Sequence, residues 1–393
     1  MKKKVSILGS TGSIGLNSLK IFEKKKNLFS IYLLSANKNF GLICNQIKKY
    51  EPQIFIINNL KTLEKVKIKF KKKNIIFVNR INECKFKLAK SNITIAAIPG
   101  IEGLHPTIEL IKKSQRVLIA NKESIICGWN LIKQTAKKNN TKIIPIDSEH
   151  FSIMKLLENE KKENIEKIYL TASGGPFLKH KISKLNKVKP SEALKHPKWK
   201  MGKKISIDSA SLMNKMLEII EAQKLFSFNL KNIEIVIHPE SLVHAIIQLK
   251  SGLYKFLYHE TTMLIPLTNA IFEESFDIKK VLKYNVVKKD FFFKNLNFQK
   301  VEKKRFPVIK LKPRMNEFYS TPIIINAVNE ILVDQYLKKK IPFNSFYDYI
   351  LNVMRDRNYK KYAIKVPKNI NQILAIDKWS REVTFKKIEN KNV

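Results

Sequence analysis

Cysteine is scarce in this sequence, and the few cysteines form no motif. Three occur among the 393 residues, Cys44, Cys84 and Cys127, and no two of them make a CxxC pair. An odd number of widely separated cysteines does not suggest a disulfide framework. The sequence therefore predicts reduced thiols and an intracellular, cytoplasmic protein.

Long hydrophobic runs are also missing. No stretch approaches the ~18 consecutive apolar residues of a membrane span. The apolar run at residues 5–8 is too short for the core of a signal peptide. Hydrophobic residues still make up 44% of the chain, as in globular proteins, and the length allows two or three domains. No membrane partner is expected.

Acidic residues are few compared with basic ones. The 33 Asp and Glu residues face 75 Lys and Arg residues, which gives a formal net charge of +42. Only seven of the basic residues are arginine, and the lysines are spread over nearly every segment. Nucleic-acid sites usually concentrate charge on one face and use arginine for base contacts. We expect no specific nucleic-acid partner, although non-specific attraction to polyanions is compatible with this charge.

Glycine is rare as well, but three of the 11 glycines fall in "GSTGSIG", Gly9 to Gly15. The motif directly follows the apolar run "VSIL" and precedes the helical pattern "LNSLKIF". Glycines let a backbone approach a pyrophosphate, and a helix N-terminus offers free N–H groups and a favourable dipole. The segment predicts a dinucleotide-phosphate site. The alternative is a tight turn with Gly12 at positive φ.

Residues 4–150 alternate short β-branched runs with helical patterns. The runs are "KVSILG", "SIYLLSA", "QIFIIN", "NIIFVN", "ITIAAIPG", "RVLIAN" and "KIIPIDS". This alternation predicts a parallel sheet with helices on both faces. We therefore expect an α/β architecture whose first domain, residues 1–150, is a Rossmann-like NADP-binding domain.

Polar residues follow two of these runs. The second run continues into Asn37, Lys38 and Asn39, with no nearby acid to hold ribose hydroxyls. A cation with amide and hydroxyl donors suits a 2′-phosphate, which favours NADP over NAD. The run "RVLIAN" continues into "NKES", and ligands gather at the carboxyl ends of parallel strands. Asn121, Lys122 and Glu123 are therefore expected to face cofactor and substrate; the alternative is a polar loop tip.

The remainder of the chain divides into three predicted regions. Residues 151–276 contain strand patterns and form an expected α+β catalytic domain. Within it, residues 173–204 carry Gly-Gly-Pro, two further prolines and dense lysine, so they are either disordered or a flexible lid. Residues 277–312 are predicted to be a linker. Residues 313–393 are predicted to be a C-terminal α-helical bundle.

Two carboxylates flank one serine in "PIDSEH". In an extended chain, residues two apart point the same way, so Asp147 and Glu149 would face a common ligand. Two close carboxylates repel unless a cation lies between them, and hard oxygen ligands select Mg²⁺ or Mn²⁺. The alternative is a solvated turn.

A second polar cluster lies on the predicted helix of residues 209–226. Asp208 or Ser209 is the expected N-cap, and Asn214 and Glu218 share one face with Lys215 beside them. Lys215 suits a phosphate, and Glu218 offers a third carboxylate to the cation. The alternative is an amphipathic helix with a solvated Lys215–Glu218 pair.

Taken together, these segments resemble the 1-deoxy-D-xylulose 5-phosphate reductoisomerase family. The resemblance rests on "ILGSTGSIG", "ANKES", "PIDSEH", "SGGPF", "HPKWKMGKKISIDSASLMNK", "LEIIEA", "IHPESLVH" and "NAVNE", in the family's order over nearly the whole chain. It implies an NADPH- and divalent-metal-dependent oxidoreductase of non-mevalonate isoprenoid precursor synthesis, using Mg²⁺, Mn²⁺ or Co²⁺. The enzyme would isomerise and reduce 1-deoxy-D-xylulose 5-phosphate, a sugar phosphate, to 2-C-methyl-D-erythritol 4-phosphate. Family members are homodimers.

The resemblance also implies roles for individual residues. The metal ligands would be Asp147, Glu149 and Glu218. Substrate contacts would come from Lys122, Ser148, Glu149, Ser173, His196, Ser209, Asn214, Lys215 and Glu218. Of these, Lys122, Glu149, His196 and Glu218 would act in catalysis. The cofactor would be lined by Thr11, Gly12, Ser13, Ile14, Asn37, Lys38, Asn39, Asn121, Glu123 and Gly202. In the lid, His196 and Trp199 would fold over bound substrate and exclude water.

Some positions depart from the family's pattern. Asn37 stands where the family usually has Gly, and Glu240 where Gln is common. Thr262 and Leu264 replace an Asp and an Arg, which puts packing or dimer contacts nearby in doubt. Two other hypotheses remain at this point: another NADP-dependent dehydrogenase that needs no carboxylate triad, and a basic nucleic-acid-binding protein.

Overall fold

The computed structural model describes residues 2–199, 201–273, 276–279 and 295–390. These residues belong to two compact units. The first unit comprises Met1–Ser124, Trp129–Phe151 and Met263–Phe293, and the second comprises Ile125–Gly128, Ser152–Thr262 and Lys294–Val393. Each unit is built around its own sheet.

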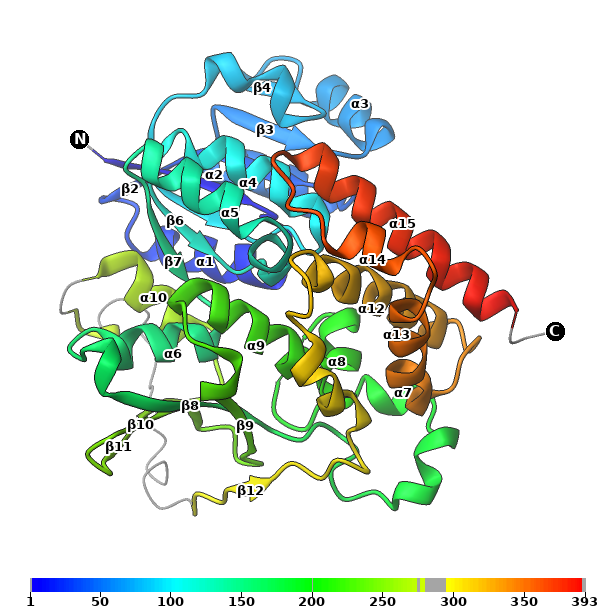
Figure 1. Ribbon diagram of the computed structural model, residues 1–393. Helices are drawn as coiled ribbons and strands as arrows, with labels where there is room; N and C mark the ends of the chain where they lie inside the picture. The colour runs from blue at the N-terminus through cyan, green and yellow to red at the C-terminus, as the bar shows by residue number, and fades with distance from the viewer. Residues whose placement is uncertain (1, 200, 274–275, 280–294, 391–393) are drawn as a thin grey trace. The chain divides into compact units, whose positions relative to one another are not determined.

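The first unit contains a parallel sheet of seven strands in the order β4-β3-β2-β1-β5-β6-β7 (Figure 1). Each predicted β-branched run forms one of its strands. The strands are β1 (Lys3–Leu8), β2 (Phe29–Ala36), β3 (Ile54–Ile57), β4 (Ile76–Val78), β5 (Ser91–Ala96), β6 (Ser114–Ile119) and β7 (Lys142–Pro145). All neighbouring pairs are parallel. The predicted Rossmann-like sheet is therefore confirmed.

Most helices of this unit lie between successive strands along the chain. They are α1 (Ser13–Lys24), α2 (Phe40–Tyr50), α3 (Leu60–Lys69), α4 (Leu104–Ile111) and α5 (Lys122–Lys138). Strand order runs one way from β1 to β4 and the other way from β5 to β7. Right-handed crossovers then place the two sets of helices on opposite faces of the sheet. Strand β3 (Ile54–Ile57) is buried throughout, because helices cover both faces of the sheet. Its sequence is therefore a continuous apolar run.

Helix α10 (Leu264–Phe272) belongs to the first unit, although the sequence placed it in the predicted catalytic region, residues 151–276. Its last turn is held by Arg116 of β6, which donates to the carbonyl oxygen of Ile271 at 3.0 Å. Lys142 of β7 forms an ion pair of 2.6 Å with Glu273. These partners are more than a hundred residues away in sequence, so no local pattern could indicate them.

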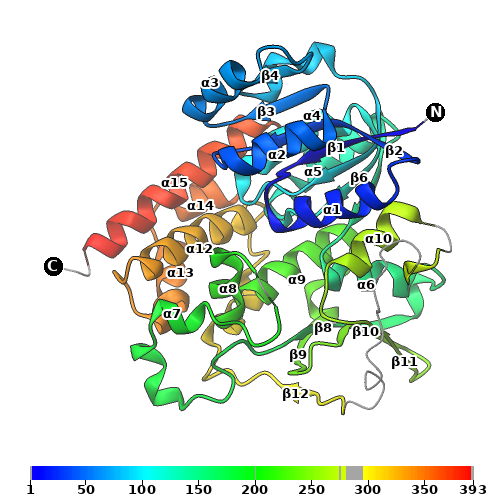
Figure 2. The same ribbon diagram turned by 180° about the vertical axis from the view of Figure 1, so that it is seen from behind.

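The second unit is built on a mixed sheet of five strands in the order β11-β10-β8-β9-β12 (Figure 2). Its strands are β8 (Ile165–Ala172), β9 (Ile233–Ile237), β10 (Val243–Leu249), β11 (Tyr254–Tyr258) and β12 (Gln299–Lys300). Only β8 and β9 run parallel; the other neighbouring pairs are antiparallel. The expected α+β character is thus confirmed for this region.

The predicted lid segment, residues 173–204, is ordered over much of its length. It contains a 3₁₀ helix at Ile182–Lys187 and the short helix α7 (Pro190–Ala193). Phe177 is only 1% exposed, and Arg305 donates to its carbonyl oxygen at 2.9 Å. Of the two alternatives for this segment, disorder is therefore excluded for the described residues; residue 200 lies outside them.

The predicted helix of residues 209–226 is in fact two helices. Helix α8 (Lys203–Ala210) ends before Leu212, which has a φ of 66°, and α9 (Met213–Phe226) follows. Asp208 therefore lies inside α8 and caps neither helix. Its carboxylate accepts a hydrogen bond of 2.8 Å from Asn329 and forms an ion pair with Lys204. The N-cap prediction was wrong. The carboxylate of Asp208 bonds Asn329, a distant residue that sequence spacing does not indicate.

The predicted linker, residues 277–312, is only partly described, since residues 280–294 lie outside the described residues. Its later part is not a free connection. Strand β12 pairs with β9, and Phe306, Val308 and Leu311 are buried around a 3₁₀ helix at Pro307–Arg314. The linker prediction is wrong for this part. It rested on the many lysines, but the apolar residues between those lysines are buried.

The C-terminal region is helical, as predicted. Its helices are α12 (Thr321–Leu337), α13 (Phe346–Met354), α14 (Tyr359–Ala363) and α15 (Ile370–Glu389). The short helix α14 adds to the helices that the sequence indicated. Helices α12, α13 and α15 pack on one another, and α12 also contacts α8 and α9 (Figure 2). Among the described residues, no helix is both long and apolar enough to cross a membrane.

Candidate active site

The glycine-rich turn joins β1 to α1 at the carboxyl edge of the parallel sheet. Gly9 has a φ of 80°, and a Cβ there would lie 2.5 Å from the carbonyl oxygen of Ala97. A Cβ at Gly15 would overlap the carbonyl oxygen of Gly9. Gly12 has a φ of −81° and precedes a first helical turn that no side chain caps. The alternative of a positive φ at Gly12 is wrong, and the turn presents helix N–H groups to a ligand.

Buried polar groups hold this turn from beneath. Ser10 donates from Oγ to Gln46 Oε1 at 2.7 Å, and Gln46 donates back to the carbonyl oxygen of Ser10 at 2.9 Å. The N–H of Gly9 donates to Ser35 Oγ at 3.0 Å. Ser35 therefore supports the turn from inside. Thr11, Gly12, Ser13 and Ile14 form its partly exposed outer surface.

The residues after β2 lie at the same edge of the sheet. Asn37 and Lys38 are exposed, and Asn39 caps α2 by accepting a hydrogen bond of 3.1 Å from the N–H of Leu42. Asn37 is not among the residues with a positive φ. The asparagine in place of the family's usual glycine therefore needs no left-handed backbone.

Asn121 is a structural junction between three segments of this edge. Its Nδ2 donates to the carbonyl oxygens of Ile98 and, at 2.9 Å, of Gly100, while Oδ1 accepts from the N–H of Ser124 at 2.5 Å. The residue is 2% exposed. Its side chain is thus engaged with protein, and a contact with cofactor would have to use its backbone. Glu123, in the first turn of the same helix, is also buried.

The acidic turn connects β7 to α6 (Ser148–Leu157). Because β7 ends at Pro145 and α6 begins at Ser148, Glu149 lies in a helical turn. The expectation that Asp147 and Glu149 share one extended strand was therefore wrong. Their proximity is nevertheless real, since each offers a carboxylate oxygen within 4.8 Å of the other.

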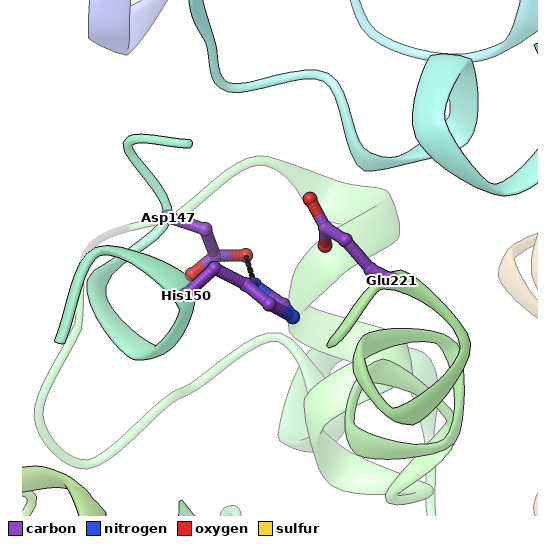
Figure 3. Close-up of side chains that lie close together, drawn as sticks. All are labelled: Asp147, His150 and Glu221. Carbon is purple, nitrogen blue, oxygen red and sulfur yellow. Dashed lines mark ion pairs between the residues drawn. The ribbon is translucent and has the colours of Figure 1, made fainter. Parts of the chain in front are cut away.

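Cationic and polar groups surround this turn. Lys122 Nζ lies 3.1 Å from Asp147 Oδ2, and their side chains are 7% and 18% exposed. Ser148 donates from Oγ to Glu149 Oε2 at 2.6 Å. Figure 3 shows His150 one helical turn beyond Asp147, with its Nδ1 3.9 Å from Asp147 Oδ2. A partly buried carboxylate pair of this kind suits a hard divalent cation.

In the second unit, the predicted phosphate residues gather around the start of the lid segment and the α8–α9 junction. Ser173 Oγ lies 3.0 Å from His196 Nε2 and accepts from the N–H of Gly175 at 3.1 Å. A Cβ at Gly175 would lie 3.0 Å from the carbonyl oxygen of Ser209, so this loop packs directly on α8. The structure thus brings Ser173, His196 and Ser209 into one region.

The protonation of His196 follows from its hydrogen bonds. Its Nδ1 accepts from the backbone N–H groups of Lys198, at 3.2 Å, and Trp199, at 2.9 Å. Nδ1 therefore carries no proton, and Nε2–H donates to Ser173 Oγ. Burial, together with the nearby charge of Lys215, lowers the pKa of His196 to about 4. The ring is a neutral hydrogen-bond donor at physiological pH.

Helix α9 carries a buried polar face. Lys215 Nζ lies 2.7 Å from Glu218 Oε2, and the two side chains are 8% and 1% exposed. Asn214 donates from Nδ2 to Glu218 Oε1. The alternative of a solvated Lys215–Glu218 pair is therefore wrong. Glu221, drawn in Figure 3, lies one turn further along the same helix and is also buried.

One predicted cofactor position is little constrained by the structure. Gly202 precedes α8 and has no atom within 4 Å of a built Cβ, so no packing requires glycine there. Sequence reasoning assigned no role to His150, Glu221 or His244, although each lies in or beside a quoted motif. In the sequence, each of these three is a polar residue within an otherwise apolar helix or strand pattern. Such a residue can be functional or simply exposed, and only its burial in the structure distinguishes the two.

Fold and site together define the class of protein. A doubly wound sheet with a glycine-rich turn at its carboxyl edge is typical of nucleotide-binding enzymes, and the carboxylate pair after β7 adds oxygen ligands suited to a hard cation.

Comparison with known proteins assigns the family. Three sequence models match: 1-deoxy-D-xylulose 5-phosphate reductoisomerase over residues 5–128, and the two C-terminal domains of that enzyme over residues 143–226 and 260–383. The 1-deoxy-D-xylulose 5-phosphate reductoisomerase of Pelagibacter ubique is 43% identical over 94% of this chain and 96% of its own length. That of Wolbachia from Drosophila simulans is 39% identical over 100% of this chain and 99% of its own length.

Solved structures agree with these relatives. The reductoisomerase from Zymomonas mobilis in complex with NADPH superposes with a TM-score of 0.88 at 27% identity, covering 99% of this chain and 100% of that chain. A second reductoisomerase, in complex with NADPH, fosmidomycin and magnesium, gives 0.90 at 28% identity, covering 98% of both chains. The chain therefore belongs to the 1-deoxy-D-xylulose 5-phosphate reductoisomerase family.

Proposed function

We propose that this protein converts 1-deoxy-D-xylulose 5-phosphate to 2-C-methyl-D-erythritol 4-phosphate, using NADPH and a divalent cation. The observation that carries the proposal is full-length similarity to reductoisomerases combined with a carboxylate pair and a buried polar helix face at the positions of the family's motifs. The substrate first isomerises to an aldehyde, and hydride reduction of the aldehyde then gives the product.

The glycine-rich turn fits a dinucleotide. No Cβ fits at Gly9 or Gly15, because each packs closely on backbone atoms of the protein and so allows the tight turn; Gly12 is exposed, and a pyrophosphate would approach the turn on that side. Lys38 is exposed beside the turn, at the place where a 2′-phosphate would lie. Thr11, Gly12, Ser13, Ile14, Asn37, Asn39, Asn121, Glu123 and Gly202 are the other proposed cofactor contacts. NADPH supplies the hydride.

The carboxylates fit a hard cation. Asp147, Glu149 and Glu218 are the proposed ligands, and their oxygens match the preference of Mg²⁺ or Mn²⁺. The cation supplies positive charge that stabilises the enolate-like charge developing on substrate oxygens. Lys122, whose Nζ lies 3.1 Å from Asp147 Oδ2, is proposed to donate to a substrate hydroxyl. Ser148 would make the neighbouring substrate contact.

The second unit supplies proposed phosphate donors. Lys215 brings a buried ammonium, Asn214 a side-chain amide, and Ser173 and Ser209 hydroxyl groups. His196 stays neutral and donates from Nε2, so it can hold a phosphate oxygen without proton transfer. Closure of the lid segment would then exclude water from the aldehyde before its reduction.

The direct test is consumption of NADPH with 1-deoxy-D-xylulose 5-phosphate and Mg²⁺ or Mn²⁺. We expect turnover that stops when a chelator removes the cation and resumes when the cation is restored. Metal-independent turnover, or none with either cation, would contradict the proposal. Metal-independent reduction of another aldehyde would favour a different NADP-dependent dehydrogenase.

A matched pair of variants tests the metal ligands. Glu218→Gln should lower turnover by at least about 100-fold, because one carboxylate charge is lost at the cation. NADPH affinity, measured by fluorescence titration, should not change. Glu163→Gln, an exposed glutamate of the same unit, is the control. Normal turnover of Glu218→Gln would remove this residue from the metal site.

The protein is also proposed to be a cytoplasmic homodimer. Strand β11 lies at one edge of the second sheet and exposes Tyr254 and Phe256, and Leu253 just before it is also exposed, so a second copy could cover this edge. Sedimentation of the wild type should give the mass of two chains, and Phe256→Asp should shift it towards one chain. A wild-type monomer would contradict the proposal. The buried, reduced cysteines agree with a cytoplasmic location.

A further inference from the structure

Two histidines form a stacked pair in the second unit. The rings of His244 and His259 lie 3.8 Å apart between centroids, with an angle of 18° between their planes. His244 is the extra residue at a register shift between β10 and β11, where Val243 pairs with Tyr258 and Ala245 with Leu257. A β-bulge of this kind re-aims a side chain. Here it brings His244 onto the ring of His259, which directly follows β11.

Backbone groups select one tautomer for each ring. His244 Nε2 lies 3.1 Å from the carbonyl oxygen of His259, and His259 Nδ1 lies 2.7 Å from the carbonyl oxygen of Glu260. A carbonyl accepts only, so each of these nitrogens carries a proton. The residues are 2% and 7% exposed, and burial lowers the pKa of both, that of His259 to about 4. Both rings are neutral at physiological pH.

His244 connects this pair to the lid segment. The indole of Trp199 meets the His244 ring edge-on, with centroids 6.1 Å apart and an interplanar angle of 73°. The N–H of Trp199 also donates to His196, whose Nε2 contacts Ser173. After burial, the charge of Lys215 also lowers the pKa of His244. The stacked pair thus supports the lid residues next to the proposed phosphate donors.

Among the described residues, the hydrogen bonds and ring contacts of His259 are with His244 and Glu260 and with none of these donors. Its Nε2 is buried and has no hydrogen-bond partner in the described part of the chain. An unsatisfied buried nitrogen is unfavourable, and an apolar ring would avoid that cost. The imidazole of His259 therefore acts on its surroundings through the stack with His244 and through the bond from Nδ1–H to the carbonyl oxygen of Glu260.

We propose that His259 is a positioning residue for the lid: it holds the neutral His244 ring in the orientation against which Trp199 packs when phosphate is bound. This inference rests on the proposed function only in assigning the phosphate to a substrate. His259 acts through His244 and Trp199 and makes no contact with substrate.

The test compares His259→Gly, which removes the ring, with His259→Phe, which keeps a flat ring. In the full-length enzyme, His259→Gly should raise the KM for 1-deoxy-D-xylulose 5-phosphate roughly 3- to 10-fold, the size of a lost aromatic pair. The KM for NADPH should stay within about twofold, because the glycine-rich turn is unaffected. His259→Phe should restore the substrate KM to within about threefold of wild type. Phe385→Ala, which removes an exposed ring of the same unit outside the lid segment, is the control.

A second readout does not depend on turnover. In a background with Trp129→Phe and Trp379→Phe, Trp199 fluorescence is titrated with inorganic phosphate. We expect a saturable change in the wild-type background, a weakened response with His259→Gly and recovery with His259→Phe. If His259→Gly does not fold, His259→Asn takes its place as the variant without a ring.

The outcomes separate the two proposals. If the wild-type protein consumes no NADPH but Trp199 still responds to phosphate in a ring-dependent way, the proposed function fails and the role of His259 stands. If the ringless variant matches wild type in substrate KM and in the Trp199 response, His259 has no positioning role. Failure of His259→Phe to restore either quantity would also overturn it, because the stack would then not be the contributing contact.

Discussion

Replacement of Asn121 by Ala tests whether this residue holds the cofactor edge of the sheet together. Asn121 is 2% exposed. Its side-chain amide donates to the carbonyl oxygens of Ile98 and Gly100 and accepts from the N–H of Ser124. Loss of a helix N-cap costs about 1 kcal/mol, and each deprived buried carbonyl adds about 1 kcal/mol. Asn121→Ala should therefore lower the free energy of unfolding by about 3 kcal/mol.

A matched control isolates the long-range part of this effect. Asn59 caps α3 through a bond of 2.9 Å to the N–H of Thr62, and within the described part of the chain its side-chain oxygen bonds no residue outside its own turn. Asn59→Ala should cost only about 1 kcal/mol. Urea denaturation of both variants gives the comparison, and KM for NADPH should rise in Asn121→Ala alone because the 98–100 loop contacts the glycine-rich turn. Equal destabilisation of the two variants, with unchanged KM, would refute this reasoning.

Three further predictions follow from the same geometry. Gly15→Ala should disrupt the turn and abolish tight NADPH binding, because its Cβ would overlap the carbonyl oxygen of Gly9. Gly12→Ala, whose Cβ has its nearest protein atom at 3.4 Å, should keep the stability of wild type but weaken NADPH binding, because that Cβ lies on the exposed side that a pyrophosphate would approach; urea denaturation and fluorescence titration measure both. His196 has an ordinary pKa of about 6.5 when unfolded and a pKa lowered to about 4 by burial and then by Lys215 when folded. The stability that depends on its neutral form is thus complete above about pH 6.5 and is lost as pH falls towards 4, so urea midpoints of His196→Gln should decline less over this window than those of wild type. Lys215→Met leaves the carboxylate of Glu218 buried without its 2.7 Å ion-pair partner and should destabilise the protein by about 3 to 5 kcal/mol. The double variant with Glu218→Leu should recover most of that loss, and failure to recover would show that the pair is not the cause.

The parallel sheet was predictable because its signals are local. Each strand is a short β-branched run that is buried on both faces, and each run is separated from the next by a helical pattern. The glycine-rich turn was predictable for the same reason, since steric freedom at Gly9 and Gly15 is a property of those residues. The proximity of Asp147 and Glu149 was also expected, although the geometry proposed for it was wrong.

The helix containing the polar cluster could not be divided from sequence. Leu212 adopts a left-handed backbone with a φ of 66°, which its residue type disfavours, and its side chain is buried. Tertiary packing imposes that break. Asp208 is drawn into α8 by Asn329 of α12, a contact that sequence spacing cannot reveal.

The sequence by itself determined the strands of the first sheet, the glycine-rich turn and the family, because these depend on short patterns and on residue types that only a few backbone conformations accept. Tertiary structure alone decided which polar groups are available to a ligand. It buried Lys215 against Glu218, engaged the side chain of Asn121 with protein, and stacked His244 on His259. Burial and long-range hydrogen bonds set the charge and orientation of those groups, and neither can be read from neighbours in the chain.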